Sequence, residues 1–369
     1  MKRQSPLILT AAALTFAACQ AKAQSSVTLY GRLDMGFDYL SNTRGGGADY
    51  RMQSANWGAS YFGFRGKEDL GGHTHAIFNL EAGIDMASGE QADSARYFNR
   101  IATVGISDDD WGTLTLGRTL GLSNYQWDFD PFQQELTSSQ SLSRGRLGPV
   151  TSNTVSYISP SYRGLSMQAQ YAFGNASSGF NNGLSGDYGR SGGVQINYAS
   201  GPFRAMGMYE ELRDSNGRFS NVFVSSREWF GGLSLRTGKM LWQGAALHLS
   251  APDTPAGLAS SANEYWFGGK YTLSPALEID AAVFHVDVGS GAGDATHDAG
   301  GHATMFTLGT LYQLSKRTVL YTTLAHVRNG AHSNFSVNAN NPGSDNSNST
   351  NPAFGASQTG AYCGVIHYF

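Results

Sequence analysis

Apolar and polar side chains alternate along this chain, and few folds accept such a pattern. In the stretch SSVTLYGRLDMGFDYL, an apolar set runs from Val27 to Tyr39 and a polar set from Thr28 to Asp38. A period of two places the two sets on opposite faces of a β-strand. The pattern recurs in later segments such as 164–173, and long stretches with the 3.6-residue period of a helix are missing. The chain is therefore predicted to be all-β.

Turn-forming residues divide the chain into sixteen such segments. Short breaks such as Ser200-Gly201-Pro202 alternate strictly with long polar breaks, of which the first is 41–56 and the last 329–356. An even number of strands with short turns at one end and long loops at the other is typical of an outer-membrane β-barrel. The predicted strands are 27–40, 57–66, 73–86, 96–107, 111–120, 153–159, 164–174, 191–200, 203–212, 226–236, 239–251, 262–272, 277–288, 302–314, 317–328 and 357–369.

A soluble β-sandwich is the alternative that alternation alone does not exclude. Sandwich strands are about half as long as most of these segments, and their loops have no reason to alternate in length. Aromatic residues such as Tyr39, Phe173 and Phe369 also gather toward segment ends, as an interfacial girdle requires. We therefore predict a 16-stranded antiparallel transmembrane β-barrel, with apolar side chains facing lipid and Arg32 and Asp34 facing water. Side chains do not fill a barrel of this width, so it should enclose a channel.

Residues 1–23 are typical of a cleaved signal peptide. Lys2 and Arg3 precede an apolar run, and Ala-Lys-Ala ends at residue 23. We expect the exported chain, 24–369, to be one barrel domain; a lipoprotein anchored at Cys19 is the alternative. The whole chain has 25 basic and 28 acidic residues, and the leader removes basic ones, which argues against nucleic acid as a partner. Cys363 then has no partner for an internal disulfide.

Several motifs resemble the trimeric general porins of Gram-negative outer membranes, in the branch whose mature chain begins near SSVTLYG. The resemblance covers essentially the whole mature chain. It implies a homotrimer in the outer membrane, passive diffusion of ions and small hydrophilic solutes, and a third loop folded into the lumen as a constriction. It rests on SSVTLYG at 25–31, FGFRGKEDLGG at 62–72, FNR at 98–100, WGTLTLGR at 111–118, TVSYISPSYRGLSMQAQY at 154–171, LSKRTVLY at 314–321 and the terminal Phe369.

The resemblance also implies a set of constriction residues, in which acidic side chains of the third loop face basic side chains of the barrel wall. The third loop corresponds to about 121–152, and its Trp127, Phe129 and Phe132 are unusual for a loop in solvent; a solvated outer loop is the alternative. Two positions, Tyr61 and Ile366, lack the arginine common in relatives, which weakens the case for a strongly cationic lumen. The basic candidates are Arg32, Arg100, and Arg144 or Arg146; the acidic ones are Asp128, Asp130 and Glu135.

Further expectations concern the rest of the lumen and the partners. We expect Tyr30, Asp34, Asp38, Tyr61 and Arg65 to line the lumen and the terminal Phe369 to act as an assembly signal. The expected partners are two further copies of the chain, outer-membrane lipid with lipopolysaccharide, and the barrel-assembly machinery. We expect no cofactor.

Other interpretations than a general porin are open from the sequence. A metal site formed by Asp294, His297, Asp298 and His302 fits no strong ligand spacing. A barrel hydrolase needs an activated serine, and no nucleophile-elbow signature is present. An adhesin remains an alternative, although the Asn/Ser-rich break near 329–351 is flexible polar sequence. A channel that prefers particular substrates stays open as a second interpretation.

Overall fold

The computed structural model describes residues 26–44, 46–146, 148–174, 189–338 and 350–369. The expected signal peptide and residues 339–349 of the Asn/Ser-rich stretch lie outside the described residues. Among those described, no helix is long and apolar enough to cross a membrane. The strands are β1 (Ser26–Leu40), β2 (Asp49–Ser54), β3 (Tyr61–Gly71), β4 (Thr74–Gly83), β5 (Ile101–Asp108), β6 (Gly112–Leu120), β7 (Val150–Ile158), β8 (Leu165–Ala172), β9 (Ser191–Ser200), β10 (Phe203–Leu212), β11 (Arg227–Thr237), β12 (Met240–Ser250), β13 (Ser261–Ser274), β14 (Leu277–Val288), β15 (Gly301–Gln313), β16 (Thr318–Asn329) and β17 (Gln358–Tyr368).

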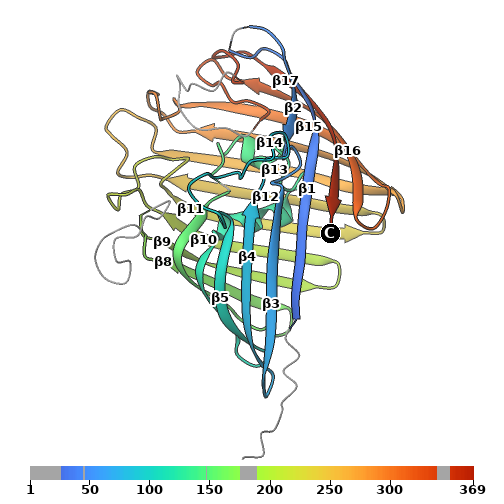
Figure 1. Cartoon of the computed structure of the whole chain (residues 1–369). Helices are drawn as coiled ribbons and strands as arrows, with labels where there is room; N and C mark the ends of the chain where they lie inside the picture. The colour runs from blue at the N-terminus through green and yellow to red at the C-terminus, as the bar shows by residue number, and fades with distance from the viewer. Residues whose placement is uncertain (1–25, 45, 147, 175–188, 339–349) are drawn as a thin grey trace, which may run out of the picture.

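The strands close into an antiparallel barrel (Figure 1). Each strand from β3 onward pairs with the next, and β17 pairs with β1 through a register that includes Asp34 and Ile366. On its other side β1 pairs with β3 in its first half and with β2 in its second half. Because β2 and β3 both pair with the same side of β1, they count as one strand position around the barrel. The barrel therefore has sixteen strand positions, which confirms the predicted fold class.

The predicted break 41–56 is wrong in one respect, because it contains the strand β2. The chain bends between β2 and β3, where Ala55 has a φ of 66°. Alternation is present in β2, with Tyr50 and Met52 exposed and Arg51 turned toward Asp38. The segment is short and rich in polar residues, so the pattern does not stand out from a loop.

Side chains of β1 alternate between the inner and the outer face of the barrel, as the sequence pattern predicts. Arg32, Asp34 and Asp38 are buried on the inner face, whereas Val27 and Phe37 are exposed on the outer face. Short turns join β3 to β4, β5 to β6 and the later alternate pairs, while the long connections lie at the opposite ends of the strands. The apolar face therefore surrounds the barrel, as a lipid environment requires.

The interior is not uniformly polar, contrary to the expectation of a water-lined inner face. Strands β10 to β15 turn many apolar side chains inward, beside buried charged ones such as Glu228 and Glu264, and loops cover this surface. Phe129 of the third loop lies 6.2 Å from Phe230 between ring centroids, and Phe132 lies 6.4 Å from Phe284. Burying this surface removes it from water and stabilises the loops inside the barrel. The buried inner side chains include Met206, Met208, Phe230, Leu247, Trp266, Phe284, Val286 and Met305.

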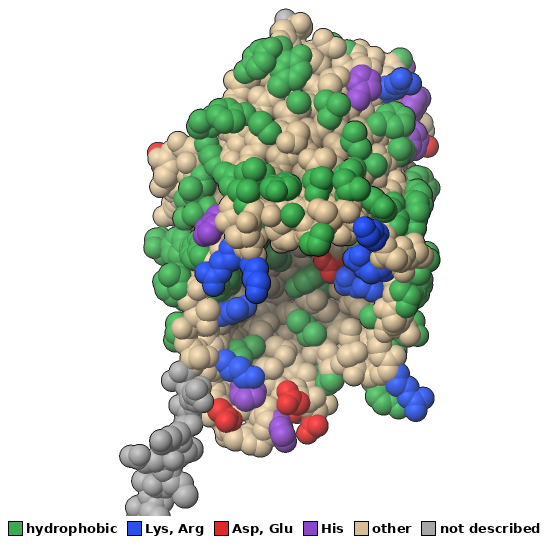
Figure 2. Space-filling model, turned by 90° about the vertical axis from the view of Figure 1, so that its right-hand side faces the viewer, with side chains coloured by type: hydrophobic (Ala, Val, Ile, Leu, Met, Phe, Trp, Pro, Cys, Tyr) green, Lys and Arg blue, Asp and Glu red, His purple; other side chains and the backbone are tan. Residues whose placement is uncertain are grey.

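The open part of the barrel therefore lies along the other strands. Figure 2 shows a hollow with Lys and Arg side chains on opposite sides of its rim and hydrophobic side chains around the outside. On β7 to β9 the inner face carries neutral polar residues, among them Thr154, Gln168 and Gln195. On β1 to β4 and the residues that flank them, the inner face carries charged side chains.

Candidate functional site

The third loop, 121–149 in the structure, runs along the inside of the barrel wall. It begins with a 3-10 helix at Leu122–Phe129 and contains a second one at Ser139–Ser141. The Trp266 indole on β13 donates to the Phe129 carbonyl at 2.9 Å. On β16, Thr323 donates to the Glu135 carboxylate at 2.6 Å. The loop thus contacts strands that lie far from its own ends at β6 and β7.

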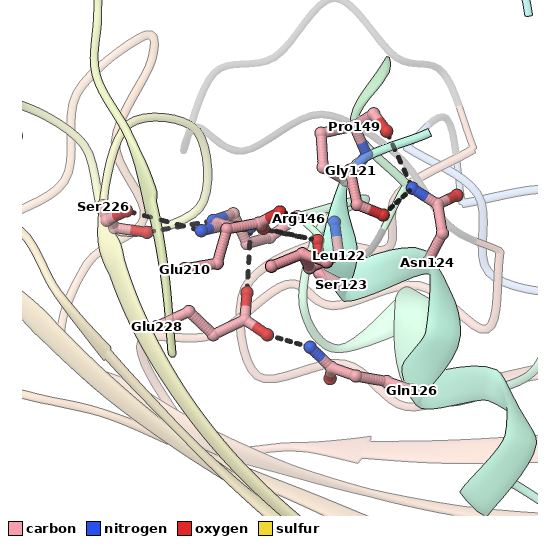
Figure 3. A network of polar contacts seen from close by, with 10 residues as sticks. All are labelled: Gly121, Leu122, Ser123, Asn124, Gln126, Arg146, Pro149, Glu210, Ser226 and Glu228. Carbon is pink, nitrogen blue, oxygen red and sulfur yellow. Dashed lines mark hydrogen bonds and ion pairs between the residues drawn. The ribbon is translucent and has the colours of Figure 1, made fainter. Parts of the chain in front are cut away.

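Arg146 holds the end of the loop against the wall (Figure 3). Its side chain has no exposed surface, and Nη1 lies 3.0 Å from Glu210 of β10 and 2.9 Å from Glu228 of β11. Glu210 also accepts a hydrogen bond from the Leu122 backbone N–H at 2.7 Å. One wall carboxylate therefore binds both the beginning and the end of the loop. Gln126 donates to Glu228 and extends the same network.

Arg144 binds other loops rather than the lumen. Its guanidinium lies 2.7 Å from Asp298 and donates to Asn334 at 2.7 Å. It also stacks over the Phe335 ring at 4.3 Å from the centroid. Both arginines that follow the third-loop acids are thus buried and paired, and neither is a free cation in the lumen.

Asp130 and Glu135 also differ from the predicted arrangement, because they lie between the loop and the wall rather than facing the basic side chains. Asp130 is fully buried and accepts from the backbone N–H groups of Phe132 and Ser139, both at 2.8 Å. Burial raises the pKa of Asp130 to about 6, although these hydrogen bonds oppose the shift. Burial likewise raises the pKa of Glu135 to about 8, opposed by the hydrogen bond from Thr323.

The buried Glu135 predicts a pH dependence of stability. Its pKa rises from 4.5 to about 8 on folding, so the folded loop keeps a proton that the unfolded chain releases. Stability should therefore fall as pH rises across that interval and level off above it. In Glu135→Gln the thermal transition of the detergent-solubilised protein should depend less on pH between about 5 and 8. The exposed Asp128→Asn serves as control and should keep the wild-type pH dependence; equal profiles for wild type and Glu135→Gln would contradict the assignment.

Asp128 is the third-loop acid that stays accessible. Its side chain is 57% exposed and lies 3.2 Å from the guanidinium of Arg204, which is 52% exposed. Arg204 is on β10, on the inward parity of Met206. The loop therefore presents an ion pair to water at this point rather than an unpaired carboxylate.

Arg32 and Arg100 lie close together on the opposite wall and share the ring of Tyr61. Their guanidinium carbons are 5.5 Å and 4.7 Å from its centroid. Arg100 donates its Nε to Glu81 of β4 at 3.2 Å. Arg32 is 5% exposed and donates to the Ala59 carbonyl and, at 2.7 Å, to the third-loop Gln134. The loop and the basic wall therefore meet through an amide and not through Asp130 or Glu135.

The remaining lumen residues divide into accessible and buried groups. Arg65 on β3 is exposed, and Tyr30 beneath it is partly exposed, with the guanidinium carbon 5.0 Å from the ring centroid. Asp34 is covered instead by the segment after β2, whose Trp57 N–H donates to it at 2.7 Å. Asp38 is paired with Arg51 at 2.5 Å. Asp34 and Asp38 point inward, but neither is an open lumen charge.

Sequence reasoning missed Gln134, Arg204, Glu81 and Lys67. Lys67 is exposed on the same inward parity of β3 as Arg65. The alternation of inward and outward side chains along β3 and β4 places Lys67 and Glu81 on the inner face, so the sequence could have predicted both. Gln134 and Arg204 depend on where the third loop meets distant strands, and no local pattern predicts that.

The candidate metal residues are engaged elsewhere. His297 Nδ1 lies 2.8 Å from Asp294, and His297 Nε2 lies 3.1 Å from the Ser220 carbonyl. Asp298 pairs with Arg144, and His302 faces outward at the loop end of β15. Within the described part of the chain, no group of three His, Cys, Asp or Glu side chains has the geometry to hold a metal ion.

A closed barrel with an apolar exterior, a polar inner wall on one side and a loop folded inside it defines a pore-forming protein of the outer membrane. Comparison with known sequences agrees: the chain belongs to the Gram-negative porin family, whose sequence model matches residues 10–332. The protein is therefore an outer-membrane diffusion channel and not an enzyme.

Individual relatives match over nearly the whole length. An outer membrane porin protein of Bordetella pertussis is 28% identical, over 88% of this chain and 94% of that protein. Outer membrane porin protein 32 of Delftia acidovorans is also 28% identical, over 98% and 99%. Among solved structures, an anion-selective porin from Comamonas acidovorans has 25% identity and a TM-score of 0.74, covering 94% of this chain and all of that one.

Proposed function

We propose that this porin is a homotrimer in which the third loop narrows each lumen and accessible cations on β3 favour the passage of anions. The charge balance of the inner wall supports this proposal. Three of the inward acids, Glu81, Asp38 and Asp128, each lie beside an arginine. Asp34 and Glu264 also point inward, but both are buried. In the part of the chain that the structure describes, Arg65 and Lys67 form no ion pair with a carboxylate, and both are exposed.

Paired charges produce a weak field at a distance, whereas an unpaired cation attracts anions along its side of the lumen. The excess on β3 is positive, so the expected preference is for anions. The relative from Comamonas acidovorans is described as anion-selective, which supports the same direction. A preference of a few fold is expected, because water in the lumen screens each charge.

The trimer is tested by conductance together with heat modification. Purified mature protein added to a planar bilayer should open in steps of three equal conductances, and it should migrate as a heat-sensitive trimer when electrophoresed without boiling. Its circular dichroism should be that of β-structure. Single steps with a monomer-sized band would contradict the trimer but not the barrel.

The outward face and the barrel seam suggest the remaining partners. Exposed apolar side chains such as Val104 and Leu324 would contact outer-membrane lipid, with lipopolysaccharide on the outer side. At the seam, Phe369 exchanges two backbone hydrogen bonds with Gly31, at 3.1 and 3.2 Å. A Cβ at Gly31 would lie 2.5 Å from the Phe369 ring, so the ring packs directly on this glycine.

Deleting Phe369 should therefore reduce assembly. The deletion removes both backbone hydrogen bonds and the ring that packs on Gly31, at the point where the last strand closes on the first. We expect a strong loss of heat-modifiable trimer in the outer membrane, measured in membrane fractions after expression, with the exported chain degraded or left soluble. Phe354→Ala, an exposed loop aromatic, is the matched control. Normal trimer yield from the deletion would show that Phe369 is not an assembly signal.

A further inference from the structure

The cationic side chains on the open wall rest on aromatic rings. Arg65 lies over Tyr30 at 5.0 Å from the ring centroid, and Arg100 lies over Tyr61 at 4.7 Å. The two tyrosine rings are themselves in edge contact, with centroids 6.2 Å apart and planes at 74°. These four residues, from β1, β3 and the position just before β5, form one continuous surface that we call the arginine–tyrosine cluster.

The arginines of this cluster keep hydrogen-bond donors for a solute. Arg100 uses its Nε for Glu81, and among the described residues its terminal nitrogens donate no side-chain hydrogen bond to the protein. Arg65 is exposed and stacks over the Tyr30 ring, and its guanidinium forms no ion pair within the described part of the chain. A carboxylate binds such a guanidinium edge with two parallel hydrogen bonds.

The tyrosines of the cluster are held in place and partly exposed. The Tyr30 hydroxyl lies 2.5 Å from Asn79 Oδ1 and 2.7 Å from Glu81 Oε1, both on β4. Tyr61 is flanked by Arg32 as well as Arg100. Fixed rings with accessible surface offer offset or edge contacts to another aromatic ring. The cluster therefore places hydrogen-bond donors for an anion directly beside accessible aromatic rings.

We propose that the arginine–tyrosine cluster is a binding subsite for small aromatic carboxylates that cross the channel. The carboxylate binds the free edge of Arg100 or Arg65, and the ring of the solute contacts Tyr61 and Tyr30. This inference rests on the proposed function, since it requires that solutes pass along this wall. It assigns to the two tyrosines a role in specificity that the arginines alone do not supply.

The test compares benzoate with cyclohexanecarboxylate, which has the same charge and nearly the same size but no aromatic ring. In planar bilayers, each anion is titrated against the chloride current of the wild-type channel. Benzoate should reduce the current at about two- to tenfold lower concentration, the range expected for one aromatic contact. Tyr30→Leu/Tyr61→Leu should erase this difference, and Tyr30→Phe/Tyr61→Phe should retain it.

An arginine–tyrosine pair outside the lumen provides the control. Arg163 lies over Tyr162 at 5.4 Å in the short turn after β7, and Tyr162 is 71% exposed. In Tyr162→Leu, the ratio between the blocking concentrations of cyclohexanecarboxylate and benzoate should equal that of the wild type. Equal block by benzoate and cyclohexanecarboxylate in a wild-type channel that prefers chloride to potassium would overturn this inference alone. Absence of that anion preference would overturn the proposed function as well.

Discussion

Replacing Arg146 by Met should lower the stability of the folded channel by several kcal/mol and free the third loop. The substitution keeps the length of the side chain and removes its charge, leaving Glu210 and Glu228 buried together without their cation. Removing one partner of a buried ion pair costs about 3–5 kcal/mol. We expect a markedly lower thermal transition in detergent, and a larger or noisier single-channel conductance in the fraction that still forms pores.

Two further variants separate the buried network from a general effect of losing an arginine. Arg204→Gln breaks an exposed ion pair with Asp128 and should change stability by no more than about 1 kcal/mol. Glu210→Gln/Glu228→Gln in the Arg146→Met background removes both orphaned charges and should recover part of the lost stability. A thermal transition for Arg146→Met equal to that of Arg204→Gln would contradict the role given to the network.

The fold followed from the sequence because its signal is local. Each strand carries its own period of two, and the lengths of the breaks identify the two ends of the barrel. The exception is β2, which is short and polar and pairs with the same side of β1 as β3 does. Apolar strands such as β14 were harder to interpret: Phe284 faces the covered interior and Val283 faces outward, so both faces are apolar and parity alone does not separate lipid from core.

The site was less predictable because it depends on contacts across the barrel. The aromatic residues of the third loop indicated that it folds inward, and Phe129 and Phe132 do pack on the inner wall. The partners of its acids are not local: Thr323, which binds Glu135, is 188 residues away. Resemblance supplied the residue types of a constriction, but not which carboxylates remain in water.

Ion preference should respond to accessible charges and not to buried ones. For an ion about 6 Å from one charge, Coulomb's law gives about 0.7 kcal/mol in water and about 2.8 kcal/mol at an effective dielectric near 20. The lower value already changes partitioning of each ion about threefold. Arg65→Gln/Lys67→Gln and Arg100→Gln should therefore shift selectivity toward cations, and Asp128→Asn toward anions. Asp130→Asn should have little effect, because that carboxyl has no exposed surface.

The most direct measurement is the reversal potential in a potassium chloride gradient at low salt. The reversal potential of the wild-type channel should have the sign that indicates a preference for anions. In Arg65→Gln/Lys67→Gln it should shift in the direction that indicates greater cation permeability, and in Asp130→Asn it should stay unchanged. These shifts should shrink near 1 M salt, where the screening length is about 3 Å. A reversal potential that responds to Asp130→Asn but not to Arg65→Gln/Lys67→Gln would contradict the assignment of the β3 cations as the charges that select ions.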